Sequence, residues 1–244
     1  MRLQTSDGVR LAGRYWPGDT VGYVLAHGFT GSHTTARMAA IIAALTATGA
    51  SVLAFDFRGH GASEGRSTLG DLETADLAAA VACLRERQSV PIAVLGWSMG
   101  GSVVLRHAGL GGDADAVVSV SSPGLWWERG TRAMRLVHWA AETRTGRVAT
   151  RLGGRTRLGG EWPGLPASPI EVVDRIAPTP LLIVHGDADP YFPARHARLL
   201  AAAAPDAEFW LEPGMGHAET ATTPELMARI DRWVRAALAS RPPR

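Results

Sequence analysis

A serine flanked by glycines, in the pattern G-x-S-x-G at residues 96–100, constrains the fold of this chain more than any other feature. The apolar stretch 91–95 precedes it, and a further glycine with a second apolar stretch follows at 101–105. This order predicts a strand, a sharp turn and a helix, because only small residues let strand and helix approach so closely. Ser98 would then project from the end of a sheet. An ordinary glycine-rich turn fits the same five residues.

The composition is that of a globular protein. The chain has 244 residues, of which 46% are hydrophobic and 20% charged, and this length suits one α/β domain. No apolar run approaches the ~20 residues that span a bilayer, so we expect no stable membrane insertion. The first residues lack the apolar core of a signal peptide, so we expect a cytoplasmic protein. Cys83, the only cysteine, is expected to be a buried structural thiol.

Short apolar runs alternate with helical patterns along most of the chain. Residues 2–5 and 9–16 flank an Asp-Gly turn and predict an N-terminal hairpin. Apolar periodicity predicts helices between the later runs, as at residues 34–48. Together they indicate a doubly wound, mostly parallel sheet of the α/β class. The further strands are expected at residues 22–26, 51–55, 91–95, 116–120, 179–184 and 208–211.

Residues 124–177 interrupt this alternation, since an ordinary connection between helix and strand takes only a few residues. We interpret this segment as a helical cap insertion within a single domain of residues 1–244. Such insertions often cover the site of an α/β enzyme as a lid. A helical excursion that only pads the sheet edge is the alternative. Five apolar residues recur on one face of a helix inside the segment: Ala133, Leu136, Val137, Ala140 and Ala141.

Partners for Ser98 are sought in loops that follow strands, where sites in parallel sheets lie. A serine hydroxyl attacks a carbonyl only if a histidine takes its proton and an acid orients that histidine. His217 follows the last strand and is placed to act as the base. The loop after residues 179–184 offers two acids, Asp187 and Asp189. The order serine, aspartate, histidine is the one expected for this strand–turn–helix.

Donors for an oxyanion are predicted in two places. The residue after the nucleophile supplies its backbone N–H, and that residue is Met99. The second donor would be the N–H of Phe29, in the glycine-bearing loop 27–31. This loop lacks the spacing of a dinucleotide or Walker motif, so we expect no nucleotide. Neither H-E-x-x-H nor a carboxylate cluster at ligand spacing is present, and we expect no metal and no other cofactor.

Five ordered motifs resemble those of the α/β-hydrolase superfamily. The resemblance is nearest to bacterial carboxylesterases, monoglyceride lipases and S33 peptidases. It implies Ser98 as nucleophile, Asp189 as acid and His217 as base, with the two N–H groups named above as oxyanion donors. A serine at the turn sets aside dehalogenases and epoxide hydrolases, which carry an aspartate there. The motifs lie at residues 27–31, 56–61, 96–100, 185–189 and 216–217.

The resemblance implies a serine acyl hydrolase that cleaves carboxylic esters of modest size through an acyl-enzyme. Trp126, Trp127 and Trp139 suggest an apolar cleft for a small-molecule ester, although tryptophans at such positions also pack within lids. A thioesterase or a peptidase would use the same three residues. A non-catalytic small-molecule binding module of the same fold is the alternative from another class, because fold alone does not fix function.

Positive charge is concentrated in the predicted cap. The chain holds 25 arginines and no lysine, with a formal net charge of +2. Residues 128–157 hold eight arginines and two glutamates, a net +6, so the rest of the chain sums to about −4. The cluster would attract anionic substrates or an anionic lipid surface, or it forms a solvated helical face. No nucleic-acid motif accompanies it, and we expect no nucleic-acid partner.

Overall fold

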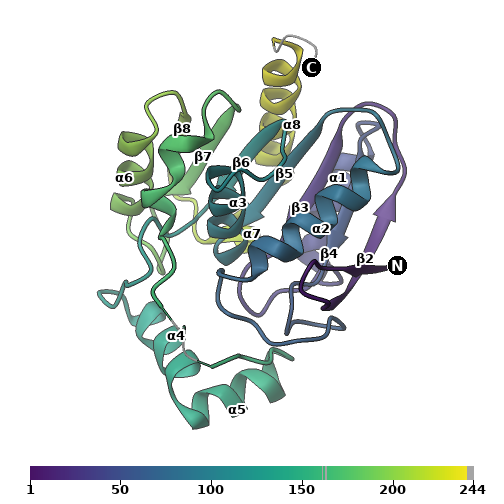
Figure 1. The fold of residues 1–244 in the computed structure, drawn as a ribbon. Coiled ribbons are helices and arrows are strands. Elements are labelled where there is room, and N and C mark those ends of the chain that lie inside the picture. The colour runs from purple at the N-terminus through teal and green to yellow at the C-terminus, as the bar shows by residue number, and fades with distance from the viewer. Residues whose placement is uncertain (161, 163, 241–244) are drawn as a thin grey trace.

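The structure, a computed structural model, describes residues 1–160, 162 and 164–240. Its centre is one sheet with eight strands: β1 (Arg2–Gln4), β2 (Arg10–Trp16), β3 (Gly22–Ala26), β4 (Ser51–Phe55), β5 (Ile92–Trp97), β6 (Ala116–Val120), β7 (Leu181–Gly186) and β8 (Glu208–Glu212). The strand order is β1-β2-β4-β3-β5-β6-β7-β8. Strands β2 to β8 are labelled in Figure 1. β2 pairs antiparallel with β1 and β4, and the remaining neighbours are parallel. The predicted hairpin and mostly parallel sheet are confirmed.

Helices cover both faces of the sheet (Figure 1). The described residues form the helices α1 (Ala36–Thr46), α2 (Glu73–Arg85), α3 (Met99–Gly109), α4 (Arg132–Glu142), α5 (Arg144–Gly153), α6 (Arg195–Ala203), α7 (Ala218–Ala221) and α8 (Pro224–Ala239), with short 3₁₀ turns at Pro169–Glu171 and Val173–Ile176. Strands β3 to β7 are buried at every position, because helices pack on both sides of them. None of the described helices combines the length and apolarity that crossing a bilayer requires.

Successive strand residues enter two separate hydrophobic cores. In β3, Val24 packs with residues of α2 and α3, whereas its neighbour Leu25 packs with residues of α1 and α8. This follows from the strand period of two, which sends adjacent side chains to opposite faces. The two cores hold the carboxyl ends of the parallel strands in fixed positions, and the loops that follow these ends therefore start from rigid points.

The segment between β6 and β7 contains two helices where the sequence predicted one. α4 and α5 project away from the sheet (Figure 1). The second helix starts close to the first, and a Cβ on Gly146 would lie 2.3 Å from the carbonyl oxygen of Trp139. α5 carries few apolar residues, so periodicity alone did not reveal it. Glu161 and Pro163 of this segment, and residues 241–244, lie outside the described residues.

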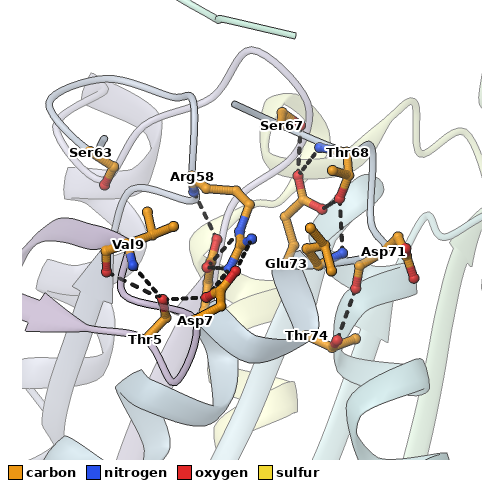
Figure 2. Close-up of polar contacts among 12 residues, drawn as sticks. Thr5, Asp7, Val9, Arg58, Ser63, Ser67, Thr68, Asp71, Glu73 and Thr74 are labelled. Carbon is orange, nitrogen blue, oxygen red and sulfur yellow. Dashed lines mark hydrogen bonds and ion pairs between the residues drawn. The ribbon is translucent and has the colours of Figure 1, made fainter. Parts of the chain in front are cut away.

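A buried ion pair fastens the loop after β4 to the N-terminal hairpin. Arg58 donates from Nε (2.9 Å) and Nη2 (2.7 Å) to the carboxylate of Asp76 in α2. It also donates from Nη1 to Asp7 in the hairpin turn, over 2.8 Å. Figure 2 shows the arginine lying between these parts of the chain. Charge-assisted bonds of this kind are the strong ones, so this loop is fixed at its start.

Glu73, at the start of α2, holds the other end of the same loop (Figure 2). Its buried carboxylate accepts hydrogen bonds from Ser67 Oγ (2.7 Å), the backbone N–H of Thr68 (2.8 Å) and the N–H of Gly70 (2.9 Å). A carboxylate in the first turn of a helix is also stabilised by the helix dipole. The loop around residues 67–70 is thereby fixed in place.

Two buried histidines lie side by side where β3 and β4 end. The ring centroids of His27 and His60 are 5.0 Å apart, and both side chains are inaccessible to solvent. His27 donates from Nδ1 to the carbonyl oxygen of Gly28 (2.7 Å), and its Nε2 accepts the N–H of Phe57 (3.1 Å). These bonds fix the neutral ring. Burial lowers the pKa of both histidines to about 4, and the proximity of His60 adds to the effect on His27.

We predict that these histidines make the fold sensitive to mild acid. The unfolded chain takes up protons below a pKa of about 6.5, whereas the folded rings stay neutral until about pH 4, so stability falls as pH decreases between these values. His60→Gln should reduce the loss of unfolding free energy between pH 7 and pH 5 by roughly 2 kcal/mol. Urea unfolding of both proteins at the two pH values measures this. Equal losses in the two proteins would contradict the prediction.

Candidate active site

Ser98 occupies the turn between β5 and α3 in a strained conformation. Its backbone angles are φ +53° and ψ −116°, a region that costs a residue with a side chain about 1–3 kcal/mol. A Cβ on Gly96 would lie 2.1 Å from the carbonyl oxygen of Gly100, and one on Gly100 would lie 2.0 Å from that of Ala26. Both positions therefore require glycine. The predicted strand, sharp turn and helix are confirmed.

The structure brings Ser98, His217 and Asp189 into one hydrogen-bonded row. Ser98 Oγ lies 2.9 Å from His217 Nε2, and His217 Nδ1 lies 2.7 Å from Asp189 Oδ2. The second oxygen of Asp189 accepts the backbone N–H groups of Tyr191 (2.8 Å) and Phe192 (3.0 Å). The aspartate side chain is fully buried and that of the histidine is 13% exposed. This geometry suits transfer of the serine proton to the ring.

Asp187, the other aspartate of the loop after β7, does not contact the histidine. Its Oδ1 accepts the backbone N–H of Gly214 over 2.7 Å. The loops after β7 and β8 also approach closely, and a Cβ on Gly186 would lie 2.0 Å from the carbonyl oxygen of Met215. Asp187 thus ties one loop to the other.

The ring of His217 is held by contacts that the sequence did not indicate. Tyr191 packs on it with ring centroids 4.3 Å apart, and Phe192 follows at 5.7 Å. The next residue, Ala218, donates its N–H to Ser121 Oγ at the end of β6, over 3.0 Å. Side chains that follow β6 and β7 therefore hold this histidine and the residue after it.

The two predicted oxyanion donors lie beside the serine without acceptors. Among the described residues, neither the N–H of Phe29 nor that of Met99 donates a hydrogen bond. Met99 begins α3, whose N-terminus carries partial positive charge. A Cβ on Gly28, next to Phe29, would lie 3.3 Å from Cβ of Ser98. An oxyanion site needs donors that are free in the unliganded protein, so the role of both N–H groups stays a prediction.

Glu219 is a site residue that the sequence analysis missed. It lies two residues after His217, and its Oε1 accepts the N–H of Gly28 over 2.6 Å. The carboxylate thereby fixes the peptide that precedes the N–H of Phe29. No sequence motif marks residue 219. Its contact with Gly28, far away in the sequence, arises only in the folded chain.

A cavity of about 1200 Å³ opens onto Ser98 and His217. Trp126 and Trp127 line it as predicted, whereas Trp139 does not and is 42% exposed. Ser67, Thr68 and Leu69 contribute to the wall from the loop that Glu73 holds. The predicted apolar face of α4 also contributes, through Leu136, Val137, Ala140 and Ala141.

Trp162, which the sequence analysis did not single out, completes an aromatic wall of this cavity. Its ring lies 5.4 Å from that of Trp126 and 6.1 Å from that of Trp127, between centroids. The indole N–H of Trp162 donates to the carbonyl oxygen of Thr68, and that of Trp126 to Pro166, both over 2.7 Å. Bonded indoles are fixed in place, so the wall is rigid and largely apolar.

Cys83 is half-buried on α2, not fully buried, and Arg87 Nη1 lies 2.8 Å from its Sγ. Burial raises the pKa of this thiol. In the described part of the chain, no group of three or more histidine, cysteine, aspartate or glutamate side chains is arranged to hold a metal ion.

Comparison with known proteins places this chain in a family. The family model described as serine aminopeptidase, S33, matches residues 22–163. The chain belongs to this family. An uncharacterized protein of Mycobacterium tuberculosis is similar as well, with 30% identity over 235 residues that cover 92% of this chain and 73% of the relative.

Solved structures agree with the family. The esterase Pf2001 of Pyrococcus furiosus is 26% identical, with a TM-score of 0.78 over 97% of this chain and 90% of its own. The α/β hydrolase GrgF of Penicillium has the same TM-score at 19% identity, covers 98% of both chains and shows the shared fold. The resemblance to α/β hydrolases is confirmed, and this S33 family member is a hydrolase.

We predict unequal roles for the two aspartates of the loop after β7. Asp189→Asn should lower kcat by roughly 10³–10⁴-fold, because the amide no longer stabilises a charged His217 ring or selects its tautomer. Asp187→Asn is the matched control and should stay within about threefold, since its amide oxygen still accepts the N–H of Gly214. Steady-state kinetics on one p-nitrophenyl ester ranks the variants. The reverse ranking would overturn the choice of Asp189.

We also predict that Glu219 positions the loop of residues 27–31, which carries the predicted oxyanion donor Phe29. Glu219→Ala removes the acceptor of the Gly28 N–H and should lower kcat about tenfold with little change in KM, as expected for a donor that acts in the transition state. Glu219→Gln keeps an acceptor and should restore most of kcat. If the role were purely structural, both variants would lose thermal stability without this difference in kcat. If the alanine variant had the wild-type kcat, the assignment would be refuted.

Proposed function

We propose that this hydrolase cleaves carboxylic esters through a covalent acyl-enzyme on Ser98. The observation that carries the proposal is the row of Ser98, His217 and Asp189, joined over 2.9 and 2.7 Å at a strained turn that opens into a large cavity. The 26% identity with an esterase, over nearly the whole chain, supports an ester as the bond cleaved. No other described cluster combines a nucleophile, a base and an acid in this way.

Acylation follows from the positions of these groups. Ser98 Oγ bonds to the ester carbonyl carbon while its proton passes to His217 Nε2. The carboxylate of Asp189 stabilises the resulting imidazolium. The former carbonyl oxygen becomes an oxyanion that accepts the N–H groups of Phe29 and Met99. When the intermediate collapses, the bond to the alcohol oxygen breaks and that oxygen takes the proton from His217.

Deacylation repeats the same steps with water. His217 Nε2 takes a proton from water as its oxygen bonds to the acyl carbon. The bond to Ser98 Oγ then breaks, and the serine recovers the proton from the ring. One ester and one water thus give one acid and one alcohol, and the three residues return to their starting protonation.

The walls of the cavity favour an apolar substrate group. Trp126, Trp127 and Trp162 form one side, and Leu136 of α4, 63% exposed in the free protein, lines the same space. Covering such a side chain with substrate removes apolar area from water, at about 25 cal/mol per Å². Because residues 124–177 supply much of this wall, we propose that the segment acts as a cap over the site.

Aminopeptidase activity is a second candidate, which the family description supports. One observation favours it, because Glu219 lines the cavity beside Ser98 and its carboxylate would attract a substrate ammonium group. A panel of p-nitrophenyl esters, acyl thioesters and aminoacyl p-nitroanilides separates ester, thioester and amide cleavage. We expect the highest kcat/KM for an ester. A higher value for an aminoacyl anilide would replace the first proposal with the second.

We predict that a fluorophosphonate probe labels Ser98 alone. Such probes react only with an activated serine, so labelling also separates an enzyme from a binding module of the same fold. Ser98→Ala should show no labelling, and its kcat should fall by about three orders of magnitude or more. Intact-mass analysis of both proteins measures the adduct, with heat-denatured wild type as the control. Labelling of Ser98→Ala to the wild-type extent would overturn the proposal.

A further inference from the structure

A second cavity, of about 300 Å³, adjoins the catalytic cavity. Arg147, Leu158, Gly159 and Gly160 line both spaces, so a molecule in one lies next to the other. The smaller cavity is distinguished by its charge, because four of the eight described residues that line it are arginines. These are Arg66, Arg147, Arg151 and Arg157.

The four positive charges have no carboxylate partner within the described residues. Three of the guanidinium groups donate to backbone carbonyl oxygens, which carry no net charge: Arg66 to Leu158, Arg147 to Ala141 and Gly159, and Arg157 to Ser63 and Gly65. A guanidinium group has five N–H donors, so each of the three keeps unused donors. None of the described residues that line this cavity is acidic.

The arginines are held in place from two sides. Arg147 and Arg151 lie one turn apart on α5, and like charges at this spacing destabilise a helix. The backbone of Arg157 pairs with the loop after β4, donating to Gly59 (2.7 Å) and accepting from Ser67 (2.8 Å). Glu73 in turn holds Ser67, as Figure 2 shows. The α5 dipole accounts for Arg151, in the last helical turn, but not for the other three arginines.

We propose that this arginine cavity binds a phosphate monoester group of the substrate, carried on the part remote from the scissile ester. A phosphate monoester has a charge of about −1.5 to −2, which suits several cations better than a single carboxylate does. The planar guanidinium fork binds phosphate oxygens in pairs. The two cavities share four lining residues, so the phosphate end and the ester end of one substrate would lie in adjoining spaces. The proposal rests on the ester hydrolysis proposed above and names the class of ester.

Binding is tested without catalysis, in the Ser98→Ala protein. Calorimetric titration with phenyl phosphate should show saturable binding that Arg66→Gln combined with Arg151→Gln weakens at least tenfold. Arg132→Gln combined with Arg144→Gln is the matched control, since it removes the same charge from exposed arginines of the cap that line neither cavity. We expect less than a twofold change in the control. Equal weakening in both pairs, or no binding to the parent, would overturn the site.

Recognition during turnover is tested with two p-nitrophenyl esters of equal length, one ending in phosphate and one in a hydroxyl group. The ratio of their kcat/KM values should fall at least tenfold in Arg66→Gln/Arg151→Gln, mainly through KM, and should not change in the control pair. An unchanged ratio would overturn the proposal. A second result would also overturn the proposal: the protein co-sediments with phosphatidylglycerol vesicles through Arg66 and Arg151 but does not bind phenyl phosphate. Phenyl phosphate binding without ester hydrolysis would leave the site intact and refute only the proposed function.

Discussion

The rest of this structure depends on the close approach of β3, β5 and α3 at Gly96 and Gly100. A Cβ on either glycine would lie within 2.1 Å of a backbone oxygen, so the contact is between main chains and cannot be relaxed by moving a side chain. This contact holds Ser98 at φ +53°. The strain of about 1–3 kcal/mol persists because strands buried on both faces and two hydrophobic cores fix the surroundings. A rigid sheet is thus the condition for a strained serine at the edge of the cavity.

The same rigidity explains how loops far apart in sequence meet. Parallel strands end at one edge of the sheet, so the loops after β5, β7 and β8 deliver Ser98, Asp189 and His217 to one place. Close backbone contact at Gly186 fixes the last two loops against each other. The neighbours that refine the geometry, such as Tyr191 against the histidine ring, come from the same loops. The relative positions of these three side chains therefore depend on the sheet as a whole more than on any single side-chain contact.

The sequence predicted what depends on local pattern. The strands, the turn at Ser98 and the positions of Asp189 and His217 follow from short apolar runs and from residues directly after them. Strand position alone could not decide between Asp187 and Asp189, because both follow β7. The motif of the resembling family was needed to select Asp189. Trp162 and Glu219 were missed because their roles arise from contacts with Thr68 and Gly28, far away in the chain. α5 was missed because it is short and rich in arginine, and its two large apolar side chains, Val148 and Leu152, are exposed and not part of the core.

Charge divides the region around the serine into two environments. Glu219 places a carboxylate beside residues 27–31, where it accepts the N–H of Gly28. Three of the four arginines of the adjoining cavity donate to backbone carbonyl oxygens, and none of the four has a carboxylate partner among the described residues. Repulsion among like charges at close range favours whatever anion neutralises them. Glu73 holds Ser67, whose N–H donates to the carbonyl oxygen of Arg157, so the backbone of this arginine is tied to a fixed loop. The fold thus keeps positive charge concentrated next to an apolar cleft, where an ester with one charged end would be oriented before reaction.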